Sequence, residues 1–189
     1  SDDVLNFITK DLLSAANPNN SLGDKVTVRD VLDQVESKID QVRDKETQAT
    51  IHVTVGIIYR KLGHFQTSES HLLKALNLHD DLYPNSRKES LEIIEELASV
   101  YRDEGQFNEA AKLMREVVSI LEQDGNINID LLTSMTKLVL VLRWSGEIIE
   151  AESIINKAYT ISIDLGKEIE REELKSEDLL DKDELQKIK

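Results

Sequence analysis

Arginine is the charged residue that recurs at one fixed place in a repeated pattern of this chain. Arg60, Arg102 and Arg143 each lie three residues before a glycine, and these glycines, at 63, 105 and 146, are 42 and 41 positions apart. A guanidinium group stays charged and offers a planar fork of N–H donors that matches a carboxylate. One such group per repeat predicts a row that grips the carboxylates of an acidic or C-terminal peptide. The alternative is a set of ordinary ion pairs with acids of the same chain, such as Glu95, Glu96 and Asp103.

Other side chains give little basis for catalysis or metal binding. The four histidines are His52, His64, His71 and His79. None lies at metal-ligand spacing from carboxylates on one helix face, and we expect His64 in a turn and His71 and His79 on polar helix surface or in a connector. The chain has no cysteine, no glycine-rich phosphate loop and no nucleophile motif. We therefore predict no metal, no cofactor and no enzymatic activity.

Composition limits both the fold and the partners. Of the 189 residues 40% are hydrophobic and only 4% aromatic, with 7 glycines and 2 prolines, which is typical of an all-helical protein. The formal net charge of −14 makes nucleic acid an unfavourable partner and a basic or mixed-charge protein a favourable one. No apolar run approaches the roughly 18 to 20 residues that span a bilayer, so we expect no membrane insertion of this segment.

The elements that must position the arginines follow from the repeat. A unit centred on Tyr-Arg-x-x-Gly-x-Phe occurs at 59–65 and 101–107, and a weaker copy follows at 142–148. A fixed period of this size indicates stacked helix-turn-helix units, hence an all-α, right-handed superhelical solenoid of antiparallel helix pairs. The predicted helices span 47–62, 67–77, 88–104, 108–123, 130–145 and 149–165. They form three repeats, at 47–87, 88–129 and 130–166.

Two further segments flank the repeats. Residues 1–46 are predicted to form an N-terminal helical hairpin that caps the array, with its second helix beginning after an N-cap at Thr27. The apolar stripe of that helix is Val31, Leu32, Val35, Ile39 and Val42. Residues 167–189 predict a charged C-terminal helical region, either a partial repeat or a cap, in which Ser176 begins a separate short helix.

Small and large residues alternate within the repeats, as close helix packing requires. Gly56 and Ala98 lie two turns before the turn glycine, where the second helix of the pair passes close. Val139 occupies this place in the third copy and predicts looser packing there. Small residues also recur on the second helices, at Ser68, Ala110 and Ala151, and at Ala75, Val117 and Ala158, where the next helix docks.

On these residues the chain resembles a tetratricopeptide repeat protein over roughly positions 47–165. The usual period is about 34 residues, and the longer period here resembles that of kinesin light chains and many bacterial proteins. The third copy departs from the family because it lacks the tyrosine and the phenylalanine. The resemblance implies a non-catalytic module that holds a peptide or helix of a partner protein in a concave groove lined by the first helix of each pair.

The predicted groove residues combine several chemistries. Beside the three arginines they are Thr54, Ile57, Lys61, Glu95, Ser99, Lys137 and Trp144. The asparagines common in light-chain-like repeats, and the Lys/Asn pattern that grips chaperone tails, are not reproduced. Trp144, the only tryptophan, is either an exposed binding anchor or the apolar end of its helix.

A second resemblance leaves another function open. Residues 7–13, 17–18 and 27–33 resemble a segment that precedes such repeats in some bacterial serine/threonine kinases and winged-helix transcriptional regulators. The chain would then be a regulatory, sensory or self-associating segment of a larger signalling protein, and a homo-oligomer is compatible with this role. The acidic start shows no signal peptide. The compartment stays unknown, with the cytoplasm favoured and the periplasm open if the chain belongs to a membrane-anchored regulator.

Overall fold

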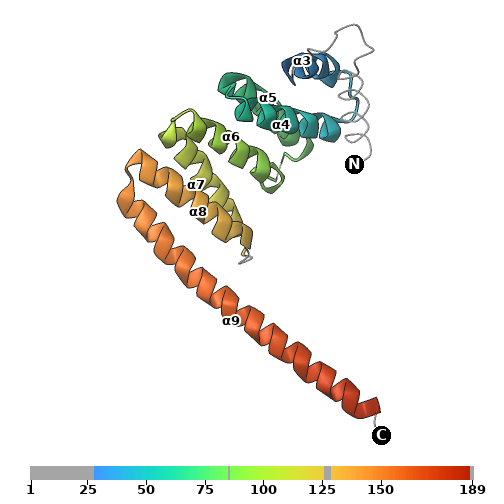
Figure 1. The fold of residues 1–189 in the computed structure, drawn as a ribbon, viewed down its shortest axis with the longest axis vertical. Helices are drawn as coiled ribbons and strands as arrows, with labels where there is room; N and C mark the ends of the chain where they lie inside the picture. The colour runs from blue at the N-terminus through green and yellow to red at the C-terminus, as the bar shows by residue number, and fades with distance from the viewer. Residues whose placement is uncertain (1–27, 85, 126–128, 188–189) are drawn as a thin grey trace. The chain divides into compact units, whose positions relative to one another are not determined.

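The structure, a computed structural model, describes residues 28–84, 86–125 and 129–187. Its elements (Figure 1) are α3 (Val28–Ile39), α4 (Lys45–Lys61), α5 (Phe65–Leu82), the 3-10 turn η3 (Lys88–Ser90), α6 (Leu91–Asp103), α7 (Phe107–Gln123), α8 (Ile129–Ser145) and α9 (Ile148–Lys187). All regular structure in these ranges is helical, which confirms the predicted all-α class. The chain forms two compact units, and their boundary falls within α7, between Leu113 and Met114.

The first unit is built on the pair formed by α4 and α5, with α3 packed on α4 and α6 packed on α5 (Figure 1). Helical spacing gathers the apolar residues of α3 and α4 into one buried cluster: Leu32, Val35, Ile39, Ile51, Val55 and Tyr59. A second cluster joins α5 to α6: Leu72, Ala75, Ile93, Leu97 and Val100. Burial of each large aliphatic side chain contributes roughly 1.5–3 kcal/mol, so these clusters hold the helices in place.

Each repeat glycine ends the first helix of its pair, as predicted. Gly63, Gly105 and Gly146 have φ angles of 79°, 84° and 85°, a left-handed conformation that other residues adopt only with strain. In each turn the amide of the residue after the glycine donates back to a carbonyl five positions earlier. The N···O distances are 2.9 Å for His64 to Tyr59, 2.7 Å for Gln106 to Tyr101 and 2.9 Å for Glu147 to Leu142. This is the Schellman motif, which satisfies carbonyls at the helix end.

Gly56 is small because α5 leaves no room for a side chain. A Cβ at this position would lie 2.9 Å from Cγ of Leu72, a side chain that is fully buried. The same close approach lets the Ser68 hydroxyl donate to the Gly56 carbonyl at 2.7 Å. The predicted role of small residues between α4 and α5 is therefore confirmed, and Ser68 adds a buried hydrogen bond to it.

The helix boundaries differ from the predictions in three helices of the first unit, and α6 begins at Leu91, after the 3-10 turn η3, rather than at 88. Helix α4 begins at Lys45, because the carboxylate of Asp44 accepts a hydrogen bond from the Thr47 amide at 2.8 Å and acts as the N-cap. Helix α5 runs from Phe65 to Leu82, so its predicted end at 77 is wrong. The physical stop is Pro84, which disfavours helical backbone at the residue before it, Tyr83.

The second unit contains the C-terminal part of α7 together with α8 and α9, and α8 packs along the first part of α9. Helix α9 is one continuous element from Ile148 to Lys187, so the predicted separate helix beginning at Ser176 is wrong (Figure 1). Gly166 lies inside this helix without left-handed backbone. A helical glycine costs only about 1 kcal/mol relative to alanine, and the flanking Glu, Lys and Leu residues favour helix.

The N-terminal prediction is tested in part. Helix α3 follows the position predicted for the second helix of the hairpin, and its Leu32, Val35 and Ile39 are buried. The first helix of the hairpin and the predicted cap at Thr27 lie outside the described residues. The proposed domain limits at 46 and 166 stay predictions.

Candidate functional site

Two of the predicted groove arginines are engaged by acids of the same chain. Nη1 of Arg60 on α4 lies 2.6 Å from Oδ2 of Asp103 at the end of α6, and its Nη2 lies 3.3 Å from Oε2 of Glu96. Arg102 donates to Oδ1 of Asp103 from Nε at 3.0 Å and from Nη2 at 2.8 Å. Asp103 therefore bridges two guanidinium groups and joins α4 to α6.

This cluster of Arg60, Arg102, Asp103 and Glu96, called here the arginine cluster, carries two positive and two negative charges. Burial acts to raise the pKa of Asp103, but the hydrogen bonds from Arg102 and Arg60 outweigh it and hold that pKa below its usual value. Asp103 is therefore ionised at neutral pH. Both oxygens of Asp103 accept hydrogen bonds from the arginines. An incoming carboxylate would therefore have to displace Asp103 to reach the guanidinium nitrogens that Asp103 binds.

The other predicted site residues of the first unit share one face of α4 and one face of α6. Thr54, Ile57 and Lys61 follow one another at spacings of three and four on α4, as Glu95 and Ser99 do on α6. Lys61 is exposed and the other four are half-buried. The Thr54 and Ser99 hydroxyls donate to carbonyls one turn earlier in their own helices, at 2.9 Å and 3.0 Å. We call these five residues the α4–α6 face.

The remaining predicted site residues, Lys137, Arg143 and Trp144, belong to α8 in the second unit. Arg143 and Trp144 are exposed, Trp144 by 53%, while Lys137 is half-buried. The tryptophan thus has the exposure that a binding anchor requires.

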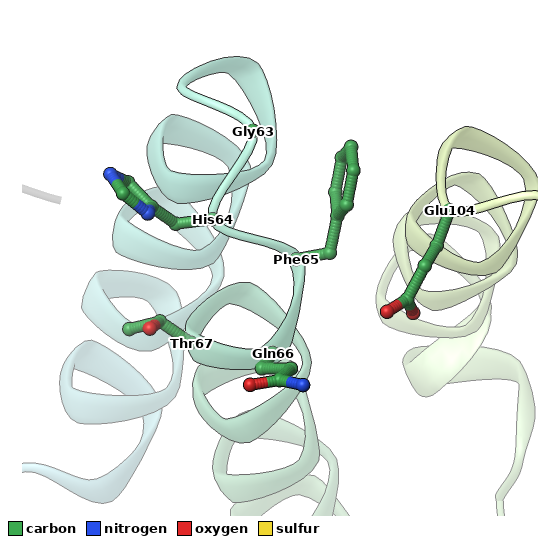
Figure 2. Close-up of a pocket in the computed structure, with 6 residues that line it drawn as sticks. All are labelled: Gly63, His64, Phe65, Gln66, Thr67 and Glu104. Atoms are coloured by element: carbon green, nitrogen blue, oxygen red, sulfur yellow. The ribbon is translucent and has the colours of Figure 1, made fainter.

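A polar pocket lies at the turn between α4 and α5, and sequence reasoning did not predict it. Its volume is about 290 Å³, and it is lined by Gly63, His64, Phe65, Gln66, Thr67 and Glu104. Figure 2 shows Phe65 and Glu104 on facing sides of this hollow, with the His64 ring pointing away from Phe65. The pocket is a by-product of the tight turn, because four of its six lining residues follow the turn glycine directly.

An apolar groove runs between α8 and α9 in the second unit. Its volume is about 400 Å³, and the lining residues are Leu132, Met135, Thr136, Val139, Leu140, Ile155, Ala158, Tyr159 and Ser162. None of these side chains is charged. Val139 lines this groove, half-buried, at the place where the sequence predicted looser packing of the third copy.

The largest error of sequence reasoning concerns the histidines. His71 was expected on polar surface, but it is 5% exposed and pairs with His52, which is 4% exposed. Their Nδ1 atoms are 2.9 Å apart, and Nε2 of His71 lies 3.2 Å from Oε1 of Glu36 on α3. The hydroxyl of Tyr59 donates to the same oxygen at 2.7 Å, and its ring stacks on His71. We call these four residues the buried histidine network.

The protonation of this network follows from its contacts. Because the carboxylate of Glu36 can only accept, His71 donates to it from Nε2, and the Nδ1 of a neutral His71 then accepts from Nδ1–H of His52. Burial, followed by the charges of His71 and Lys74, lowers the pKa of His52 from 6.5 to about 4. Burial also lowers the pKa of His71, against the opposing effect of Glu36. The pair is therefore neutral at pH 7 and ties α3 to α4 and α5.

Further polar contacts were not predicted from the sequence. The Tyr101 hydroxyl donates to Oε1 of Glu69 on α5 at 2.5 Å, so the repeated tyrosine forms a hydrogen bond as well as packing. In the second unit Arg115 of α7 binds Glu150 through two hydrogen bonds, of 2.8 Å and 2.7 Å, and also binds Glu147. The only sequence signal for these pairs was the repeat spacing itself, which does not specify partners.

No cluster of three or more metal-binding side chains occurs among the described residues. In the same part of the chain, no helix combines the length and the apolar character needed to cross a membrane.

Comparison with known proteins identifies the repeats. Residues 47–123, which include α4 to α7, match the family model of the tetratricopeptide repeat. Together with the helix pairs, the glycine turns and the small contact residues described above, this match shows that the segment consists of tetratricopeptide repeats. Such stacked repeats typically serve as non-catalytic scaffolds for protein–protein interaction. Comparison with curated proteins gives no match.

Solved structures place the fold near kinesin light chains. Two crystal structures of a putative kinesin light chain with nearly identical TPR-like repeats from Podosopora anserina align with TM-scores of 0.63 and 0.61 at 20% and 21% identity. They cover 72% and 71% of this chain. BtubC (BKLC) from P. vanneervenii aligns over 73% with a TM-score of 0.64 at 17% identity. This chain spans 66%, 65% and 57% of these three structures, less than two thirds of each.

Proposed function

We propose that this protein is a non-catalytic interaction module that binds a segment of a partner protein along the α4–α6 face. The observation that supports the proposal is a half-buried apolar residue, Ile57, among hydrogen-bonding and charged side chains on two adjacent first helices. Buried clusters fix these helices from the opposite side. The face is therefore rigid before binding, which lowers the entropic cost of association.

The arginine cluster has a positioning role in this proposal. Arg60 donates one hydrogen bond and Arg102 two to Asp103, which lies 43 residues after Arg60, and these bonds tie α4 to the end of α6. Partner contacts then fall to Thr54, Ile57 and Lys61 on α4, and to Glu95 and Ser99 on α6. The competing proposal is the arginine row, in which Arg60, Arg102 and Arg143 grip an acidic peptide.

Affinity capture from the source cell, with the full chain as bait, separates these proposals. Substitution of Ile57→Lys should abolish capture of the specific partner, because it puts a charge into the apolar contact. The control Leu73→Lys changes a residue that is 42% exposed on α5, outside the face, and should leave capture unchanged. Circular dichroism would verify that both variants fold. Full capture by the Ile57→Lys variant would contradict binding at this face.

The arginines are tested by a charge swap. The double variant Arg60→Asp with Asp103→Arg reverses the ion pair between α4 and α6 and removes the positive charge from its place on α4. Because it also sets like charges beside Glu96 and Arg102, circular dichroism and urea denaturation must verify that the variant is folded. If the arginines only position the helices, the swapped protein retains its partner. If they grip a carboxylate, the swap removes the partner, as would the triple replacement of Arg60, Arg102 and Arg143 by alanine.

The alternative function, a regulatory, sensory or self-associating segment of a larger bacterial signalling protein, stays a prediction of the sequence. No specific contact in the described residues favours it over partner binding.

A further inference from the structure

The second helices of the three repeats differ sharply in how well their equivalent residues are covered. Leu72, Met114 and Ile155 occupy the same place in successive repeats, and their exposed fractions are 0%, 2% and 47%. One turn later, Val118 of the second repeat is 4% exposed, whereas its equivalent in the third repeat, Tyr159, is 67% exposed. The third repeat thus leaves open a surface that the earlier repeats bury, and this surface is one wall of the apolar groove.

The first unit shows what kind of element fills such a surface. Around Leu72 and Ala75 the cover is α6, which presents Ile93, Leu97 and Val100 at spacings of four and three residues. These three side chains form one stripe of a helix. The groove between α8 and α9 continues the same mode of repeat stacking, so a helix with apolar residues at i, i+4 and i+7 matches its shape and chemistry.

The described part of the chain does not supply this helix itself. Residues 167–187 continue α9 along its own axis beyond Ile155 and Tyr159, and do not turn back over them. Within the described residues, a second copy would present the same groove but not the apolar stripes of α4 and α6, because these are buried in the first unit. Two such grooves cannot fill each other, because neither supplies the row of protruding side chains that packs into a groove. In addition, two chains of net charge −14 repel each other.

We propose that the apolar groove between α8 and α9 binds a basic amphipathic helix of a partner protein in the place where a following repeat would stack. The lining residues give an uncharged floor for the apolar stripe of that helix. Basic residues on its outer face are favoured because the whole chain is acidic. This surface is separate from the α4–α6 face and lies in the other unit, so either proposal can fail without the other.

A peptide probe built on the chain's own α6 tests the proposal. The probe is a fluorescently labelled peptide of residues 88–106 with Glu92→Lys, Glu95→Lys and Asp103→Lys, which keeps the apolar stripe and makes the outer face basic. Its titration with the full-length chain is followed by fluorescence anisotropy. The control peptide carries Leu97→Asp in the middle of the stripe and should not bind.

Variants of the full chain locate the binding site. Ile155→Lys and Tyr159→Lys each place a charge in the groove at an exposed position, and each should weaken binding of the probe by at least about tenfold. The matched control is Ile149→Lys, on the same helix, 86% exposed and outside the groove lining, which should bind as the natural chain does. Failure of the natural chain to bind the probe, or equal binding by the groove variants, overturns the proposal.

Two further measurements decide between occupants. Light scattering after size-exclusion chromatography should find the natural chain monomeric. A dimer that Tyr159→Lys converts to a monomer would make a second copy the occupant and overturn the proposal. The full chain with Leu179→Lys and Leu180→Lys should bind the probe as the natural chain does. A marked gain in binding would mean that the C-terminal stretch covers the groove, which also overturns it.

Discussion

Acidification should destabilise the first unit through the buried histidine network. His52 and His71 lie face to face with 2.9 Å between their Nδ1 atoms, a distance that requires one donor and one acceptor. The pair can hold one extra proton and keep this contact, but a second proton would set two N–H groups against each other. Both histidines are almost completely buried, so a proton taken up here is poorly solvated.

The sign and size of the effect follow from the pKa of His52, which folding lowers from 6.5 to about 4. Well above pH 6.5 His52 is neutral in both the folded and the unfolded chain, so its titration does not change the free energy of unfolding. Between pH 6.5 and about 4 only the unfolded chain binds the proton, so the free energy of unfolding falls as the pH falls. The loss is roughly 2 kcal/mol near pH 5 and roughly 3 kcal/mol below pH 4. His71, whose pKa is also lowered, adds to the loss in the same direction.

Urea denaturation of the full chain at about pH 7.5 and about pH 5, followed by circular dichroism, measures this loss. The variant His52→Asn keeps an N–H near the Nδ1 position but does not titrate. Between about pH 7.5 and about pH 5, its free energy of unfolding should therefore drop by roughly 2 kcal/mol less than that of the natural chain. The change in the net charge of −14 on acidification is common to both proteins and cancels in the comparison. His64→Asn, at an exposed position, is the matched control and should behave as the natural chain does.

Two results would refute this reasoning. One is an equal loss of stability in the natural chain and in the His52→Asn variant. The other is an NMR titration in which the His52 ring protonates with the ordinary histidine pKa of 6.5.

The remaining predictions concern packing and hydrogen bonding. Gly56→Ala should lower the free energy of unfolding by about 1–2 kcal/mol, because the clash with buried Leu72 outweighs the gain in helix propensity. Gly166→Ala, in open surroundings on α9, should instead raise it by up to about 1 kcal/mol, and urea denaturation of both variants tests the contrast. Burial, together with a hydrogen bond to Glu69, raises the pKa of Tyr101 to about 12. Tyr101→Phe should therefore remove the phenolate absorbance step at highest pH and cost about 1 kcal/mol of stability. An unchanged absorbance titration would mean that another tyrosine has this pKa.

Much of the local structure was predictable because it depends on residues close together in the sequence. A glycine that ends a helix needs only its own left-handed backbone and the carbonyls of the preceding turn, so Gly63, Gly105 and Gly146 could be assigned from their spacing. The small residue at Gly56 was predictable for a related reason, since the period fixes where the second helix returns past the first.

The errors came where the local signal was weak. The polar run His79–Asp81 suggested the end of α5, yet nothing before Pro84 forces this helix to stop. Ser176 can cap a helix, but within a run of good helix formers its hydroxyl does not have to end the preceding one, and α9 passes through it. In both cases a signal that permits a helix end was taken as one that requires it.

The sequence by itself determined the class of this protein, the period of its repeats, and the residue types at the turns and helix contacts, because these obey short-range rules of backbone geometry and helix periodicity. Only the tertiary structure decided which polar groups meet. It joined Arg60 to Asp103, buried His71 against His52 and Glu36, and left Ile155 and Tyr159 uncovered at the third repeat. The first three contacts join residues 43, 19 and 35 positions apart, on helices that become neighbours only when their apolar faces pack. A repeated arginine can thus be assigned to a helix face from its spacing, but whether its charge is available to a partner depends on which acid packing brings beside it.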